Sequence, residues 1–164
     1  MRIVLVAALL LAACDRPPPE PPSADARPAP VLATPPLRLT LQAPAEVRPG
    51  GAVPMRLVAR NAGTASLTLA MGDSASSFDF VVNGPDGREL WSRMHSVQAV
   101  PLILHERQLS PGREIVFTDQ WDLRDNRGRA VPPGRYTLHA LLDADTMPYR
   151  MLKTPPQTLV VTPR

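Results

Sequence analysis

Apolar and polar residues alternate along several short stretches of the chain. The clearest stretch runs from Tyr136 to Leu142, where every second residue is apolar and Thr137 and His139 lie between them. Because successive side chains of a β-strand point to opposite faces, this period of two predicts a strand that buries Tyr136 and exposes His139 to solvent. The same alternation predicts strands at residues 37–42, 53–59, 66–71, 78–82, 89–94, 115–121 and 159–161.

Two further stretches predict less regular structure. Residues 100–104 are strand-like but contain Pro101. Since proline donates no hydrogen bond to a neighbouring strand, they predict an edge strand or an irregular crossing. Residues 147–156 predict an irregular loop. About seven to nine short strands, with no apolar repeat of 3.6 residues after the first fourteen positions, predict a single all-β domain, a sandwich or a barrel. The sequence around Tyr136, Pro-Gly-Arg-Tyr, resembles the tyrosine corner of Greek-key sandwiches.

The first fourteen residues have the pattern of a bacterial export signal. Arg2 precedes an apolar run, and Leu11-Ala12-Ala13-Cys14 resembles the lipobox of bacterial lipoproteins. We therefore expect residues 1–13 to be removed as a signal peptide and Cys14 to carry diacylglycerol and an acyl chain such as palmitate. The apolar run is too short to cross a hydrocarbon layer of about 30 Å as a helix. Cys14 is the sole cysteine of the chain, so no internal disulfide forms.

This signal predicts a protein of the bacterial cell envelope, anchored to a lipid bilayer through acylated Cys14, with its domain on the extracytoplasmic side. Residues 14–36 are rich in proline and poor in apolar residues, which predicts a disordered linker before a folded domain at 37–164. Without Arg2 the chain has 17 basic and 15 acidic residues, a net charge of +2. The basic residues are spread among acidic ones, so nucleic-acid binding, which needs a concentrated basic face, is disfavoured.

Several short motifs resemble the BsuPI-type intracellular proteinase inhibitor family. In the family's order they are LVARNAG at 57–63, FDF at 78–80, DGRELW at 86–91, LSPG at 109–112, Trp121, Gly128 and VPPGRYT at 131–137. The resemblance covers roughly residues 50–142. It implies an immunoglobulin-like antiparallel β-sandwich with Greek-key connections. It also implies a protein partner, a subtilisin-like serine proteinase.

The chain departs from this family in two respects. An exported protein would meet an extracytoplasmic proteinase, and residues 72–77 read GDSASS where the family more often has a Ser-Gly-Gln-like approach. The matching residues are turn formers and core aromatics, which support the fold more than the inhibition. Two hypotheses therefore stand: a lipid-anchored inhibitor, and a non-inhibitory envelope module for adhesion or assembly that shares only the fold.

An inhibitor of this kind needs an exposed loop held rigidly in extended form, because preorganisation lowers the entropic cost of binding. Two loops are candidates, 72–77 and 93–101, with simple connectors as the alternative. The residues singled out in them are Gly72, Asp73, Ser74, Ser76, Met94, His95 and Val97.

Catalytic and metal chemistry have little support in the sequence. The stretch Gly72-Asp73-Ser74-Ala75-Ser76 is not a nucleophile elbow, and the three histidines are scattered, without the spacing of a zinc site. Met94, Met147 and Met151 are soft ligands that copper accepts, but methionines that pack in a core or loop account for them as well. We expect no catalytic residue, no metal and no cofactor.

Overall fold

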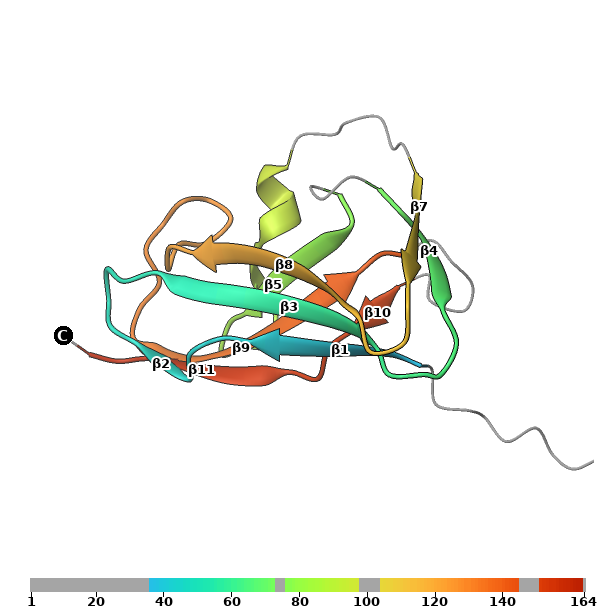
Figure 1. The fold of residues 1–164 in the computed structure, drawn as a ribbon. Coiled ribbons are helices and arrows are strands. Elements are labelled where there is room, and N and C mark those ends of the chain that lie inside the picture. The colour runs from blue at the N-terminus through green and yellow to red at the C-terminus, as the bar shows by residue number, and fades with distance from the viewer. Residues whose placement is uncertain (1–35, 73–75, 98–103, 145–150, 164) are drawn as a thin grey trace, which may run out of the picture. The chain divides into compact units, whose positions relative to one another are not determined.

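The computed structural model describes residues 36–72, 76–97, 104–144 and 151–163. These residues form a β protein within one compact unit, Thr34–Arg164 (Figure 1). Its elements are β1 (Leu37–Gln42), β2 (Glu46–Val47), β3 (Val53–Asn61), β4 (Leu67–Met71), β5 (Phe78–Asn83), β6 (Glu89–Ser92), the 3-10 helix η1 (Arg93–Ser96), β7 (His105–Leu109), β8 (Glu114–Trp121), β9 (Gly134–Leu142), β10 (Leu152–Lys153) and β11 (Gln157–Val161). None of its described helices is long and apolar enough to cross a membrane.

The strands form two main sheets and a small third one. The first sheet has the order β1-β3-β8, and the second has the order β2-β11-β9-β5-β6, with β10 beside β9. The pair β4-β7 forms the third sheet and lies beside one end of the first (Figure 1). All strand pairs are antiparallel except β2 with β11. The predicted all-β, immunoglobulin-like sandwich is therefore confirmed.

The core lies between the two main sheets, where the alternation of the sequence placed it. In β3 the inward residues from Val53 to Asn61 are buried at every second position. Aromatic rings then join the sheets: Phe78 of β5 stacks on Phe117 of β8, with ring centroids 4.7 Å apart. Trp121 meets Tyr136 edge to face at 5.8 Å. Such pairs add to the hydrophobic gain of burying the rings.

The predicted tyrosine corner is present at the start of β9. The hydroxyl of Tyr136 donates a hydrogen bond to the carbonyl oxygen of Pro132, 2.6 Å away. The ring itself is buried. The bond satisfies the one polar atom of an otherwise apolar side chain and ties the turn before β9 to the strand.

The loop between β8 and β9 closes the outer edge of β6. The backbone N–H of Asn126 donates to the carbonyl of Leu90 at 3.0 Å, and its side-chain oxygen accepts from the N–H of Ser92 at 3.0 Å. Asn126 thus occupies the hydrogen-bonding groups that a further strand would use. An edge covered in this way is protected from pairing with another chain.

The structure corrects the expectation for His139. Its side chain is on the face of β9 opposite Tyr136, as predicted, but it is buried rather than solvent-exposed, with 6% of its surface accessible. Its cross-strand neighbour Val81 is buried too. Burial, and to a lesser degree the charge of Lys153, lower the pKa of His139, partly opposed by Glu89. His139 is thus buried on the outer face of a central strand, and the alternation of the sequence does not reveal this burial.

This burial predicts that acid destabilises the domain through His139. Below about pH 6.5 the unfolded chain binds a proton that the folded imidazole, with its lowered pKa, still refuses. The free energy of unfolding should therefore fall as the pH drops from 6.5 through the folded pKa. Urea unfolding across this range measures the effect, and His139→Leu should remove that part of the pH dependence. An unchanged pH profile in the variant would contradict the assignment.

One predicted stretch lies almost wholly outside the described residues, and another differs from its prediction. Residues 100–104 were expected to form an edge strand or an irregular crossing, and of these only Leu104, just before β7, is described. Residues 147–156 were expected to form an irregular loop, but Leu152 and Lys153 pair with Leu142 and Leu141 of β9 as β10. A strand of two residues is too short to show alternation in the sequence. It forms because β9 offers it hydrogen-bonding partners.

Candidate functional site

The two loops singled out from the sequence both adjoin β5. The first loop runs into β5, and the hydroxyl of Ser77 donates to the carbonyl of Gly72 at 2.9 Å, which closes the base of the loop. Gly72 and Ser76 are half-buried. Asp73 and Ser74 lie outside the described residues. The second loop follows β6, which pairs with β5, so the two loops belong to the same end of this hairpin.

The second loop begins with a helix, which corrects the expected extended conformation. Met94 and His95 are in η1, where Val97 N–H donates back to the carbonyl of Met94 at 3.2 Å. The hydroxyl of Ser96 donates to the carbonyl of Arg93 at 3.0 Å. Side-chain bonds of this kind favour a tight turn over an extended strand. His95 is exposed and Val97 is half-buried.

The carboxylate of Asp79 holds the start of η1. It accepts the hydroxyl of Ser92 at 2.7 Å and the backbone N–H of Met94 at 3.0 Å. Burial raises the pKa of Asp79, while the bonds from Ser92, Met94 and the Phe80 backbone oppose that shift. The N-cap residue Ser92 makes no side-chain capping hydrogen bond. The half-buried carboxylate of Asp79 takes over this role by accepting a backbone N–H at the start of the helix.

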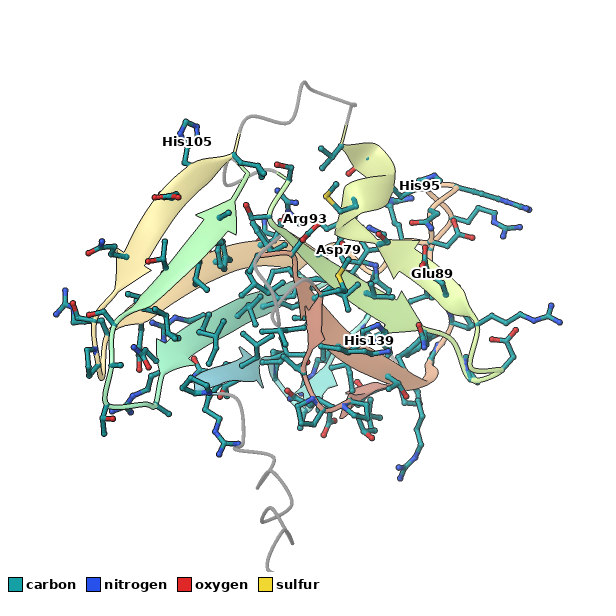
Figure 2. All side chains as sticks on the ribbon, turned by 90° about the vertical axis from the view of Figure 1, so that its right-hand side faces the viewer. Asp79, Glu89, Arg93, His95, His105 and His139 are labelled. Carbon is teal, nitrogen blue, oxygen red and sulfur yellow. The ribbon has the colours of Figure 1, made fainter. Side chains whose placement is uncertain are left out.

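Arg93 fastens η1 to both main sheets. Its Nε donates to Oδ2 of Asp119 on β8 at 2.9 Å, and its Nη1 donates to the carbonyl of Phe78 at 3.1 Å. The guanidinium also lies 4.0 Å from the centre of the Phe78 ring. Figure 2 shows Arg93 and Asp79 together at the base of the helix. Because the Arg93 side chain is largely shielded from solvent, its ion pair is screened less than one on the open surface.

A groove of about 190 Å³ lies between these loops and the end of β9. It is lined by Ser76, Phe78, Asp79, Met94, Leu141, Asp143 and Met151. The structure thus brings together two of the predicted residues, Ser76 and Met94, at a shared surface. His95 and Val97 do not line it. Met151 adds an exposed apolar side chain, with 61% of its surface accessible.

Sequence reasoning did not identify the residues that hold this site together. Asp79 was read only as part of a strand motif, and Arg93 and Asp119 were not singled out. Arg93 and Asp119 are 26 positions apart, and Asp79 and Met94 are 15 apart. Neither separation has a local signature, so no sequence signal pointed to these pairs.

The histidines of the described residues are not gathered at one site. The three histidines are on η1, β7 and β9, and Figure 2 shows them well apart. Within the described ranges, no group of three His, Cys, Asp or Glu side chains is placed to hold a metal ion. What the site offers is an apolar and acidic groove beside a fixed helix, an arrangement suited to contacting another molecule.

Comparison with known protein families shows to which family this domain belongs. The family model described as BsuPI, intracellular proteinase inhibitor, matches residues 39–147. The chain belongs to the BsuPI intracellular proteinase inhibitor family. The BsuPI family is an inhibitor family and not a catalytic one. The matched region includes both candidate loops, η1 and the tyrosine corner, and it extends at both ends beyond the motifs recognised in the sequence, which span residues 57–137.

Two solved structures show distant similarity to this BsuPI domain. Spo0M, a sporulation control protein from Bacillus subtilis, matches with a TM-score of 0.48 and 10% identity over 78% of this chain and 50% of its own. A CARDB domain of PF1109 from Pyrococcus furiosus matches with a TM-score of 0.40 and 16% identity over 77% of this chain and 93% of its own. The chain spans about half the length of Spo0M. No curated protein matches the sequence.

Proposed function

We propose that this protein is a membrane-anchored lipoprotein whose BsuPI domain inhibits an extracytoplasmic serine proteinase. Membership of the family supports a proteinase as the kind of partner. The lipobox-like sequence ending at Cys14 supports the proposed anchor and a target outside the cytoplasm, although the family is described as intracellular. The proline-rich residues 15–36 would hold the domain away from the bilayer, since polyproline segments rise about 3.1 Å per residue.

The observation that carries this proposal is the fixation of η1 at one end of the β5–β6 hairpin. Asp79 bonds the N–H of Met94, and Arg93 bonds Asp119 and stacks on Phe78. A recognition element held this firmly loses little conformational entropy when it binds, and the smaller entropic cost increases the affinity. Because η1 is helical, the contact with the proteinase is made by a preformed helical turn and not by an extended strand.

Met94 and Met151 supply the apolar side chains of this surface. Both line the groove, and methionine adapts its unbranched side chain to irregular pockets. The proposed contact with the proteinase is therefore made through apolar side chains that adapt to the surface of the partner.

The test measures inhibition by the mature chain, residues 14–164, with Cys14→Ser in place of the lipid anchor. We expect subtilisin-like serine proteinases to be inhibited at or below micromolar concentration. Met94→Glu should weaken inhibition at least tenfold, because a charge replaces the apolar contact at a loss of about 1.4 kcal/mol or more. Inhibition constants from progress curves give the result.

His105→Ala is the matched control, since His105 is exposed on β7, away from η1 (Figure 2). It should inhibit like the unmodified chain. Absence of inhibition at micromolar domain, or rapid cleavage of the domain as a substrate, would contradict the proposal. That outcome would favour the alternative, a non-inhibitory envelope module for adhesion or assembly.

A further inference from the structure

Among the strands that the structure describes, β8 ends the three-stranded sheet and pairs with β3 on one side only. In an antiparallel pair the two backbone groups of a residue point to the same side, and the side changes at every position. Asn61 of β3 exchanges hydrogen bonds with the segment just before β8, through Gly112 N–H and the carbonyl of Arg113. Following the register from Asn61, the odd-numbered residues of β8 bond to β3. The even-numbered residues therefore point their N–H and C=O groups outward.

Three successive outward-pointing residues of β8 have backbone N–H and C=O groups with no hydrogen-bond partner among the described residues. Within the described part of the chain, no hydrogen bond reaches the backbone of Glu114, Val116 or Thr118 from outside β3. The fourth outward position is closed, because the N–H of Gln120 donates to Oδ1 of Asp119 at 2.7 Å. Strand β6, by contrast, has its edge covered by Asn126. An open ladder of this kind is a template for another strand.

We propose that this edge pairs with β8 of a second copy of the chain, antiparallel about a two-fold axis at Val116. The axis places Val116 opposite itself and Glu114 opposite Thr118 of the other copy. It is the single register that matches all three open residues with one another. A closed two-fold contact of this type is the commonest way in which identical chains assemble. The two three-stranded sheets then form one continuous sheet.

Repulsion between acidic side chains also favours the register with its axis at Val116. An axis at Glu114 would place two carboxylates directly opposite each other, and an axis at Thr118 would place Glu114 opposite Asp122. Like charges in cross-strand pairs are destabilising. The axis at Val116 avoids both of these contacts, because it places Glu114 opposite Thr118. It also buries Val116, one of the few large apolar side chains that the described residues expose, with 39% of its surface accessible.

Strand β1, at the other edge of this sheet, is a poorer candidate. Its outer face carries Arg38, Thr40 and Gln42, with Arg60 beside Arg38 on β3. Pairing two copies there would gather arginines and bury no apolar side chain on that face. Prolines also flank the strand at positions 36 and 44, and proline is a common means of blocking edge pairing.

The experiment uses the mature chain, residues 14–164, with Cys14→Ser, in sedimentation velocity across a concentration series. We expect a monomer–dimer equilibrium that Val116→Lys shifts to monomer at least tenfold in dissociation constant, because two ammonium groups would meet at the axis. Thr40→Lys is the matched control on the same face and should dimerise normally. Thermal unfolding by circular dichroism confirms that each variant is folded.

A cross-linking measurement fixes the register. Hydrogen-bonded residues in an antiparallel pair have Cα atoms about 5.5 Å apart, within the range that a disulfide spans. Val116→Cys in the Cys14→Ser chain should therefore oxidise to a covalent dimer, whereas Thr40→Cys should not. A purely monomeric chain at several hundred micromolar would overturn the proposal. So would a dimer that survives Val116→Lys, or one that only Thr40→Lys disrupts.

Discussion

Replacing Trp121 with Ala will destabilise the domain by about 3–5 kcal/mol, the usual cost of removing a fully buried aromatic side chain. Trp121 has no accessible surface and contacts Trp91 and Tyr136 through ring pairs at 6.3 and 5.8 Å. Its indole N–H donates to the carbonyl of Arg124 at 2.6 Å. The substitution leaves a cavity between the sheets and an unpaired carbonyl at the start of the β8–β9 loop. Urea unfolding of the lipid-free chain measures the loss.

Two further variants make this measurement specific. Trp121→Phe keeps most of the ring packing and loses the N–H donor, so it should cost less, about 1–3 kcal/mol. Thr118→Ala alters an exposed position on the same strand and should change the stability by no more than about 0.5 kcal/mol. Equal losses for Trp121→Ala and Thr118→Ala would show that the core is not organised around Trp121.

Replacing Cys14 with Ala will move the protein from the membrane fraction to the soluble fraction. Each acyl methylene buried in a bilayer contributes about 0.8 kcal/mol, so two or three chains make a stable anchor and their loss removes it entirely. Centrifugation of lysed cells, followed by blotting of the pellet and supernatant, measures the change. Incorporation of labelled palmitate should disappear in the same variant.

Ser23→Ala, in the proline-rich segment beyond the lipobox, is the matched control and should remain in the membrane fraction. If the Cys14→Ala protein stays with the membrane, the anchor proposal is wrong. Such a result would leave the domain and its family membership unaffected, because the family match begins at residue 39.

The strand pattern of the sequence predicted most of the fold because burial on one face leaves a direct trace in the chain. The alternation in β3, from Val53 to Asn61, and in β9, from Gly134 to Leu142, is the clearest case. Turn residues such as Pro132-Pro133-Gly134 predicted where the chain reverses, since their backbone preferences are local. The tyrosine corner could be anticipated for the same reason, because its hydrogen bond joins residues only four positions apart.

His139, β10 and η1 show where such reasoning fails. Alternation predicts that His139, on the outward face of β9, meets solvent, but its side chain is buried. Strand β10 exists because β9 offers it a partner. The loop after β6 is helical because the carboxylate of Asp79, from another strand, accepts the N–H of Met94. In each case the deciding group is distant in sequence.

By itself the sequence determined the class of fold, the family and the expected export and lipid anchor, because strand alternation, turn chemistry and the lipobox are local patterns. Only the tertiary structure decided that Ser76, Met94 and Met151 share one groove and that Arg93 fastens η1 to β8. It also decided that Asn126 closes the edge of β6, whereas the outer edge of β8 pairs with no other described strand. These features depend on which strands become neighbours, and that is settled when the two sheets pack around a common core.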